Sequence, residues 1–577
     1  MSEGIINDNR VDNSKTTPII RSLRTSCAAV VYSYNSTDIT KLLPINAASD
    51  QSLGEGINSS TLGNLIGKDP TIIRQDIYKC TIRNSKDGGG SFSLSLKRGK
   101  DFVKGSNTST NNNNNTDYLS LLNPGDWIAL YLKRGQFSNS DLHSTTSESG
   151  LKFLGIIENV QEVETDDPIT GTPSLEILVT GRSFSKVFDS SLFHNPAINK
   201  QTVETVLGAS FLSDSSKSLN SISDFTADQV IKRVLQFYLK GRGSELSAAN
   251  ENWYIPQSLA QAFKGFEKDK KAGRAFYDIL YKEKIGIHKH KNGKFESAQK
   301  MSGGAFITSL PSSGSIWSVM QFLQNPVINE MYTELTLNKK GNLVPAIIMR
   351  RVPFSNKPKH ETNIFFSNKK YNKAVFSDEN SDYEKTYFID LPRHVINSSD
   401  IKRKSIGKSD HERINYTVVV PRVTSQAVFD IAYKALANTP SIQRYGLKVF
   451  NAQTSYVLSD KSDDDLISYC AKCTHLIADW FFLGHNLYNG TISIRGLEEH
   501  IEIGNNLYIE DIQQLFHIEE YTHTFSTQSS ALTDFITELT ISRGQLVKDS
   551  TAYFIASKSN PQDHNTVITS FLPRGGI

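Results

Sequence analysis

Gly490-Thr-Ile-Ser-Ile-Arg-Gly496 begins the stretch that decides the fold, which continues as Ile501-Glu-Ile-Gly-Asn-Asn-Leu-Tyr-Ile509, Phe516-His-Ile-Glu-Glu-Tyr-Thr-His-Thr-Phe525 and Phe535-Ile-Thr-Glu-Leu-Thr-Ile-Ser-Arg-Gly544. In each segment apolar and polar residues alternate over most of the length, as half-buried antiparallel strands require. Glycines lie at the ends or bends, where positive φ or close backbone approach is needed. Strands in such close succession predict a small barrel, because closure removes the edges that an open sheet exposes.

The composition indicates a multidomain globular protein. The 577 residues are too many for one hydrophobic core, and about 150 residues per domain predicts roughly three to five domains. Hydrophobic residues make up 38% of the sequence, and the mean hydropathy is −0.36. No apolar run is long enough for a membrane anchor, and residues 1–10 have neither the basic nor the apolar region of a signal peptide. We therefore expect the protein to be made and assembled in a cytoplasm.

The charge and the cysteines exclude two classes of protein. A formal charge of +3, from 63 basic and 60 acidic residues, gives no electrostatic basis for sequence-independent DNA binding. The cysteines are too few for a disulfide scaffold in a chain of this length; they are Cys27, Cys80, Cys470 and Cys473. Stability must come from hydrophobic cores and subunit contacts.

Residues 21–195 contain a second group of strand-like segments, after a polar stretch at 1–20 that predicts a flexible arm. The candidates are Thr25–Tyr34, Asp76–Arg83, Gly90–Lys97, Trp127–Leu132, Phe153–Val160 and Leu175–Thr180. Asp87-Gly88-Gly89 predicts a hairpin turn between two of them. Polar segments at 104–117, with a run of asparagines, and at 136–150 predict disordered loops. About six strands with turns between them thus predict a first β-barrel or sandwich domain over this region.

The middle of the chain changes character. Residues 196–314 predict a mainly helical domain, in which Thr226-Ala-Asp-Gln229 forms a capping box before apolar residues at helical spacing. Pro256–Phe266 and Arg274–Lys284 are further helix candidates. The charge run Lys268–Lys271 is typical of a solvated surface rather than of a nucleic-acid site.

The remaining boundaries follow from alternating helical and strand-like patterns. Residues 315–424 predict a short helix, a hairpin and the first strands of the second barrel, in the order Ile316–Leu323, Glu330–Leu337, Val344–Arg350 and Glu412–Val420. Residues 425–485 predict two inserted helices, Ser425–Ala437 and Ser462–Phe481. Residues 486–545 predict the second β-barrel, and 546–577 a C-terminal extension. The predicted fold class is α+β, mainly β, with two β-barrel domains and intervening helical segments.

The most tempting chemical motif is Cys470-Ala-Lys-Cys473, with His475 and His485 nearby. A structural zinc site usually needs two close pairs of ligands, and the sequence has no second cysteine pair. Both cysteines also share a helical spacing with Leu466, Ile477 and Trp480. This spacing favours small buried hydrophobes over metal ligands.

No catalytic constellation is found. Asp166-Asp167 and Glu498-Glu499 are interpreted as solvated turn residues, and His288 and His290 as loop residues. The chain has no phosphate-binding P-loop, zinc-protease helix or nucleophile elbow, and Asp87–Gly90 is interpreted as a turn. We therefore expect no catalytic, cofactor-binding or metal-binding residue, no cofactor, and a protein that is not an enzyme.

Several passages of the chain together match a known pattern. They include Gly90-Ser-Phe-Ser-Leu94, Pro124-Gly-Asp-Trp127, Gly181-Arg-Ser-Phe184, Asn325–Leu335, Pro345–Phe354, Asn415–Val419, Arg444-Tyr-Gly446 and the four segments of residues 490–544. Together these passages, spread over roughly residues 21–545, resemble the central baseplate hub of contractile-tailed bacteriophages. The family includes the late-control protein D group and the hub-like part of secretion-system spike proteins.

The resemblance implies a homotrimer in which each chain contributes two similar barrels, so that three chains present a ring of six. It implies a structural virion protein that connects the hexameric tail tube to the trimeric spike and adapts six-fold to three-fold symmetry. The implied partners are other copies of the chain, the tail tube protein, the spike or needle protein and other baseplate proteins, with DNA only passing through the lumen. Its implied location is the tail baseplate.

Two other classes of function were weighed. A tail-associated peptidoglycan hydrolase in the middle domain would need a poised carboxylate, and the acidic residues there form no recognised pattern; they are Glu204, Glu245, Glu251, Glu267 and Glu283. A glycan-binding module has little support, because no tandem aromatic repeat occurs. Arg495, Glu519 and Arg543 are predicted to face outward, as solvated residues or as contacts to the tube or a neighbour.

Overall fold

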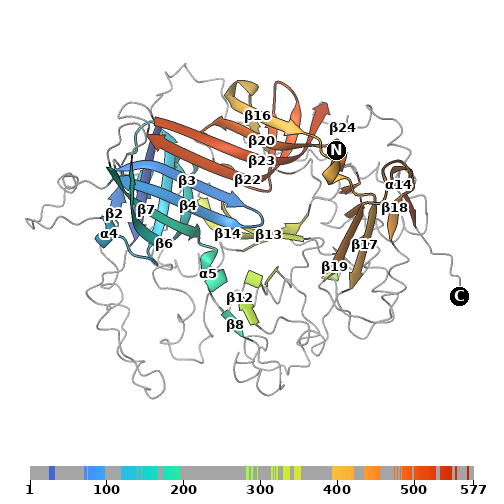
Figure 1. The fold of residues 1–577 in the computed structure, drawn as a ribbon, viewed down its shortest axis with the longest axis horizontal. Coiled ribbons are helices and arrows are strands. Elements are labelled where there is room, and N and C mark those ends of the chain that lie inside the picture. Colours follow the sequence, from blue (N-terminus) through green and yellow to red (C-terminus); the bar gives the residue numbers. More distant parts are fainter. Residues whose placement is uncertain are drawn as a thin grey trace, which may run out of the picture.

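The computed structural model describes residues within 25–32, 71–97, 118–194, 281–296, 313–352, 391–454 and 474–570, most of these stretches with internal gaps. The described part is mainly β, as predicted (Figure 1). Not one of the described helices has the length and apolarity that a membrane crossing requires.

One 14-stranded sheet dominates the molecule. Its N-terminal strands are β1 (Thr25–Tyr32), β2 (Thr71–Ile73), β3 (Ile77–Ser85), β4 (Gly89–Lys97), β5 (Trp127–Arg134), β6 (Leu151–Asp166) and β7 (Pro173–Ser183). Its C-terminal strands are β15 (Arg393–Ile396), β16 (Ile401–Gly407), β20 (Tyr488–Arg495), β21 (Asn506–Ile509), β22 (Gln514–Thr527), β23 (Thr533–Lys548) and β24 (Tyr553–Phe554).

The sheet consists of two halves with the same order of strands. The N-terminal half runs β3-β4-β7-β6-β5-β1, and the C-terminal half runs β16-β20-β23-β22-β21-β15. The halves differ at the last step, since β1 is antiparallel to β5 whereas β15 is parallel to β21. Strands β22 and β3 pair directly, so the two halves form one continuous sheet (Figure 1).

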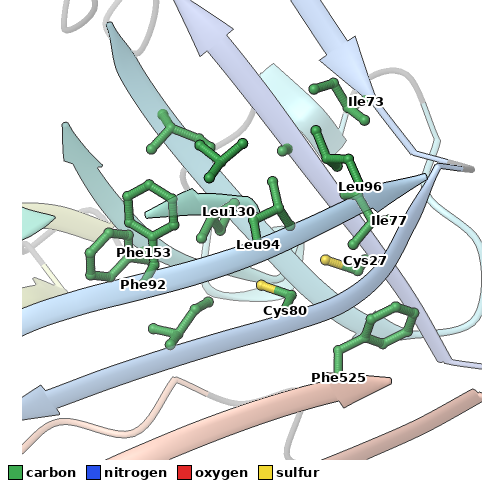
Figure 2. Close-up of a cluster of buried hydrophobic side chains, with 14 of the residues drawn as sticks. Cys27, Ile73, Ile77, Cys80, Phe92, Leu94, Leu96, Leu130, Phe153 and Phe525 are labelled. Atoms are coloured by element: carbon green, nitrogen blue, oxygen red, sulfur yellow. The ribbon is translucent and has the colours of Figure 1, made fainter. Parts of the chain in front are cut away.

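Alternating burial along the strands builds the cores. In β3 the apolar residues Cys80 and Ile82 are buried, whereas Thr81 between them and Lys79 and Arg83 beside them are not, as the period of two in a strand requires. The core of the N-terminal half also contains Phe525 from the C-terminal half (Figure 2). The two halves therefore share apolar packing as well as backbone hydrogen bonds.

Smaller sheets surround the large one. A three-stranded sheet contains β13 (Asn329–Leu337), β14 (Leu343–Arg351) and β9 (Tyr281–Lys284), and a four-stranded sheet contains β17 (Tyr416–Pro421), β18 (Leu436–Asn438), β19 (Val449–Thr454) and β25 (Ile568–Ser570). Two strand pairs join β8 (Leu192–His194) to β12 (Ser313–Ser315) and β10 (His288–Lys289) to β11 (Phe295–Glu296). The α-helices with both ends in the described part of the chain are α4 (Tyr118–Leu121), α5 (Lys186–Ser190) and α14 (Thr439–Tyr445). The 3-10 helices are η3 (Asp141–His143), η4 (Ser147–Ser149), η11 (Ser398–Asp400), η12 (Asp410–Glu412) and η13 (Gly484–Asn486).

Most predicted strands are found near their expected positions. The hairpin at Asp87–Gly89 joins β3 to β4, and the predicted pair at 330–350 forms the hairpin β13–β14. In the two predicted helices at 316–323 and 462–481, the described residues, such as Trp317 and Ala478, are helical. No closed ring of strands is found among the described pairings, which join both predicted barrels into one sheet.

The first strands of the C-terminal half were predicted in the wrong place. The strand predicted at 412–420 begins only at Tyr416 and belongs to the separate four-stranded sheet. The strands that begin the half are β15 and β16, and the second of these is a mostly exposed run, Ile401-Lys-Arg-Lys-Ser-Ile-Gly407. An exposed edge strand carries little apolar alternation, so periodicity could not find it.

Five further predictions were wrong in part. The ends of two predicted helices are strands instead: Leu436 and Ala437 pair within β18, and residues 281–284 pair with β14. Pairing with neighbouring strands overrides helix propensity at both places. The strand predicted at 501–509 begins only at Asn506. In the loop at 136–150, η3 and η4 are described and Leu142 is buried, and His288 lies in a strand rather than a loop.

Other predictions lie outside the described residues. These are the arm at 1–20, the loop at 104–117, the capping box at Thr226 and the helix at 256–266.

We expect Phe525→Ala to lower the free energy of unfolding by about 3–5 kcal/mol, because it leaves a cavity in the core that the two halves share. Denaturant unfolding of the variant and the wild type measures the difference. Ile512→Ala is the matched control, since Ile512 is an exposed apolar residue of the C-terminal half and its truncation should change stability by less than about 0.5 kcal/mol. Equal effects of the two substitutions would contradict the shared core.

Candidate functional site

The predicted chemical motif is not assembled in the described part of the chain. Cys470, Cys473 and His475 lie outside the described residues, and His485 lies in η13. The other two cysteines, Cys27 and Cys80, are free thiols buried in the core of the N-terminal half (Figure 2). Among the described residues, no group of His, Cys, Asp and Glu has the arrangement of a metal site.

The remaining candidates are equally dispersed. Asp166 is the last residue of β6 rather than a turn residue, and Glu498, Glu499, Asp167 and His290 lie outside the described residues. The site that the geometry does single out is the joint between the two half sheets, where β22 meets β3.

A repeated bulge shows how closely the two halves correspond. Strand β6 has a bulge at Glu158 in its pairing with β7, and β22 has one at Glu519 in its pairing with β23. Each bulged glutamate is held from the neighbouring strand: Arg182 Nε donates to Glu158 Oε1 at 2.8 Å, and Ser542 Oγ donates to Glu519. Bulges are features that re-aim a strand, so both halves bend at the same point.

A repeated turn is hydrogen-bonded to the residue just before the bulge in each half. In the N-terminal half, Gly125 N donates to Ile157 O at 2.8 Å, and Ile157 N donates to Asp126 O at 2.9 Å. In the C-terminal half, Gly504 N donates to Ile518 O at 2.8 Å, and Ile518 N donates to Asn505 O at 3.0 Å. Both glycines have positive φ, 96° and 76°, which a turn of this shape requires.

Beyond the bulge, one side of β22 passes from β21 to β3, while the other side stays paired with β23. The antiparallel register runs from Glu520 opposite Ser85 to Ser526 opposite Lys79. The first part of β22, from Gln514 to His517, pairs with β21 instead. One long strand thus serves two neighbours along the same edge, and its second part forms the joint.

Acidic residues of β22 face basic residues of the β3 hairpin across the joint. Arg83 makes two parallel hydrogen bonds to the Glu520 carboxylate, Nε to Oε1 at 2.6 Å and Nη2 to Oε2 at 2.9 Å. Lys86 Nζ lies 3.0 Å from Glu519 Oε2 and 3.1 Å from Glu330 Oε2. The lysine side chain is only 13% exposed, so its pairs are screened less than surface ion pairs.

Burial alone would raise the pKa of Glu519, but the charge of Lys86 and the hydrogen bond from Ser542 outweigh it and lower that pKa. This glutamate and Arg543 were predicted to face outward. The prediction was wrong for Arg543, which is buried with a positive φ of 57°, whereas the side chain of Glu519 is 36% exposed at the joint. Arg495 is exposed, as predicted.

A buried carboxylate fastens the hairpin β13–β14 across the joint. Glu334 is 2% exposed, and its Oε2 accepts from Asn84 Nδ2 at 3.0 Å and from Ile503 N at 3.1 Å. Its Oε1 accepts from Tyr521 OH at 3.2 Å and from Leu335 N at 2.9 Å. Donors from both halves thus converge on a single side chain of the hairpin.

Burial dominates the titration of this network. It raises the pKa of Glu334 well above the ordinary value, although the hydrogen bonds from Ile503 N and Leu335 N oppose the shift. The pKa of the buried His500, which bonds Leu335 O through Nε2, falls to about 4, mainly through burial. Burial is also the main reason why the pKa values of His394 and His523 are lowered.

Sequence reasoning missed this network. Glu334 belongs to a predicted strand, but alternation gives no sign of which polar residue is buried. The only signal was that a glutamate stands between Tyr332 and Leu335, two residues that are also buried. Its donors come from residues 84, 335, 503 and 521, and their meeting depends on the joint.

Comparisons with known proteins give distant structural matches. No protein-family model and no curated protein matches the chain. A 43 kDa tail protein of prophage MuSo2 from Shewanella oneidensis is 10% identical, with 82% of this chain and 94% of that chain covered and a TM-score of 0.33.

Two further matches come from secretion systems. The half-lidded Francisella PdpA-VgrG complex is 11% identical over 90% of this chain, with a TM-score of 0.33; only 58% of that chain is covered. An E. coli component of the type VI secretion system, described as structurally similar to the T4 bacteriophage tail proteins gp27 and gp5, is 8% identical. It covers 83% of this chain and 76% of its own, with a TM-score of 0.29.

We expect Glu334→Ala to lower the free energy of unfolding by about 2–5 kcal/mol, because it leaves several buried hydrogen-bond donors without an acceptor. Glu334→Gln retains one acceptor oxygen and should cost less. Equilibrium unfolding measures both, with Glu412→Ala as the control, since Glu412 is exposed in η12. A Glu334→Ala variant as stable as the control would show that the carboxylate does not hold the joint.

The contribution of His500 to stability should fall on acidification below about pH 6.5. The pKa of His500 is about 4 in the folded chain and 6.5 ordinarily, so between these values the unfolded chain binds a proton that the folded chain excludes. The contribution is present above the upper value and is lost as pH falls toward the lower one, on the order of 3 kcal/mol. Unfolding free energies at pH 7 and pH 4.5 test this, and His500→Gln should show a shallower pH dependence. An unchanged slope in the variant would refute the assignment.

Proposed function

We propose that this chain is a structural protein of a tail baseplate, the central hub that connects a six-fold tail tube to a three-fold spike. The observation that carries the proposal is the joining of two half sheets of the same strand order, edge to edge, within one chain. The residue passages that resemble the baseplate hub family support it. The proposal rests on these passages and on the sheet topology rather than on the distant structural matches.

Two equivalent halves in one chain would solve a symmetry problem. Three copies of such a chain present six similar half sheets, which match a six-fold tube, while the assembly itself keeps only three-fold symmetry. In this arrangement each half sheet is one of the tube-type barrels that the resemblance implies. The partners would be the tube protein on one side and the spike on the other, and DNA would pass through the lumen.

Elements that occur once per chain suit the three-fold side. The sheet formed by β17, β18, β19 and β25 follows the strand β16 of the C-terminal half and has no counterpart after β3, among the described residues. The hairpin β13–β14 also contributes its buried glutamate once, at the internal joint. Such single-copy elements would repeat three times in a trimer, as a trimeric spike requires.

A catalytic role has no observation in its favour among the described residues. The carboxylates that a peptidoglycan hydrolase in the middle domain would use lie mostly outside them, and residue 283 lies in β9, opposite Met349 of β14. The virion tail is the expected location of a hub.

The mass of the purified protein, alone and mixed with its spike and tube partners, tests the proposal. We expect a trimer, in at least one of these states, that binds both partners. Electron microscopy of the assembled particle should show three copies at the layer between tube and spike. A monomer under all assembly conditions, with no affinity for tube or spike, would overturn the proposal, and lysis of cell walls by the purified protein would favour the hydrolase.

A further inference from the structure

One side of the outer part of β6 is an edge to which no strand is paired in the described structure. Residues 151–156 of this strand pair with β5, whereas the part beyond Ile157 is registered only against β7. Asn159, Gln161, Glu162 and Glu164 are exposed there. This part of β6 corresponds to the part of β22 that forms the internal joint, because both follow the repeated bulge.

The opposite end of the sheet carries the other edge. Strand β16 pairs with β20 on one side and ends the order of strands on the other. It occupies the place in the C-terminal half that β3 occupies in the N-terminal half, since β16–β20–β23 corresponds to β3–β4–β7. Its exposed residues include Lys402, Arg403 and Lys404.

We propose that β6 of one chain pairs with β16 of a second copy of this chain, in the register that β22 and β3 use internally. The bulges align Gln161 with Thr522, and the pairings with β20 and β4 align Gly407 with Arg83. Thr522 lies opposite Arg83 in the internal joint. The transferred antiparallel register is therefore Gln161–Gly407, Glu162–Ile406, Val163–Ser405 and Glu164–Lys404.

The charges of the two edges fit this pairing. The outer part of β6 carries Glu162 and Glu164, and β16 carries three consecutive basic residues. In the transferred register Glu164 faces Lys404 directly, and opposite charges in directly opposed cross-strand positions are stabilising. The polarity is also that of the internal joint, where the β22 side is acidic and the β3 hairpin is basic.

If the contacts within a chain and between chains are of the same kind, they can form a closed ring. Within a chain the C-terminal half offers its β22 edge to β3, and between chains the N-terminal half offers its β6 edge to β16. Every contact is then head to tail, and such contacts close a ring when the rotation per unit divides the circle. The number of chains in that ring is three if the proposed function is correct, and the pairing itself deepens that proposal.

Disulfide formation between Val163→Cys and Ser405→Cys tests the register. In the doubly substituted full-length chain, oxidation should give covalent multimers on a non-reducing gel, up to the closed ring. An equal mixture of the two single variants should give covalent dimers only. The wild-type chain controls for native cysteines, and the pair Val163→Cys with Gly407→Cys, shifted by two residues along the strand, should cross-link several times less.

A charge exchange provides a second readout. Glu164→Lys or Lys404→Glu alone should weaken association about fivefold per joint. The combined variant should recover, because every joint again has opposite charges. Recovery also controls for the hydrogen bond that Lys404 Nζ makes to Gln514 Oε1 at 2.7 Å within the chain.

The outcomes separate the pairing from the hub function. Cross-linking at 163 and 405 with recovery of the charge exchange supports the pairing, even if no tube or spike binds, in which case the hub function fails alone. A trimer that binds both partners but does not cross-link at these positions, or cross-links better in the shifted register, overturns the pairing and leaves the hub function standing.

Discussion

A β-strand leaves a row of backbone N–H and C=O groups along each edge, and this constraint governs the arrangement of the large sheet. The backbone groups along one edge of β22 are paired by two strands in succession, β21 along its first residues and β3 along the rest. The bulge at Glu519 lies between the two pairing segments. Because a bulge bends the strand and increases its twist, it turns the later part of β22, which stays paired with β23, toward the edge strand β3 of the other half. The joint between the halves thus depends on one extra residue in one strand.

The hydrogen bonds of the polar network at Glu334 can all form in only one arrangement of the two halves. A buried carboxylate is costly unless donors surround it, and the donors to Glu334 come from β3, from the turn before β21, from β22 and from its own hairpin. They converge only when the two halves and the hairpin are all in place. A shift of β22 along β3 would leave the carboxylate without Tyr521 or Asn84. The network therefore specifies the register of the joint in addition to any stability that it adds.

Local pattern predicts much of the fold, and long-range pairing explains what it missed. Strands with one buried face, such as β4, β20 and β23, were placed within a few residues, because alternation reports burial directly. Strand β16 was missed because it is exposed, and Leu436 was assigned to a helix because nothing local indicates that β17 and β25 lie beside it. The joint could not be predicted for the same reason: β3 and β22 are more than 400 residues apart along the chain, as the Arg83–Glu520 pair records. A repeated bulge has no sequence signature that distinguishes Glu158 from any other glutamate in a strand.

The internal joint and the proposed joint between copies need different chemistry, because they would form at different times. The internal joint forms as the chain folds, and it can place Phe525 opposite Cys80 in a dry core. The edges proposed to join copies must stay apart in water until assembly, and an apolar edge would pair with any strand it met. Charged residues on an exposed edge prevent such pairing. Glu164 and Lys404, at the positions of Phe525 and Cys80, would keep each edge soluble alone and complementary to the other, so that the same register serves folding inside the chain and recognition between chains.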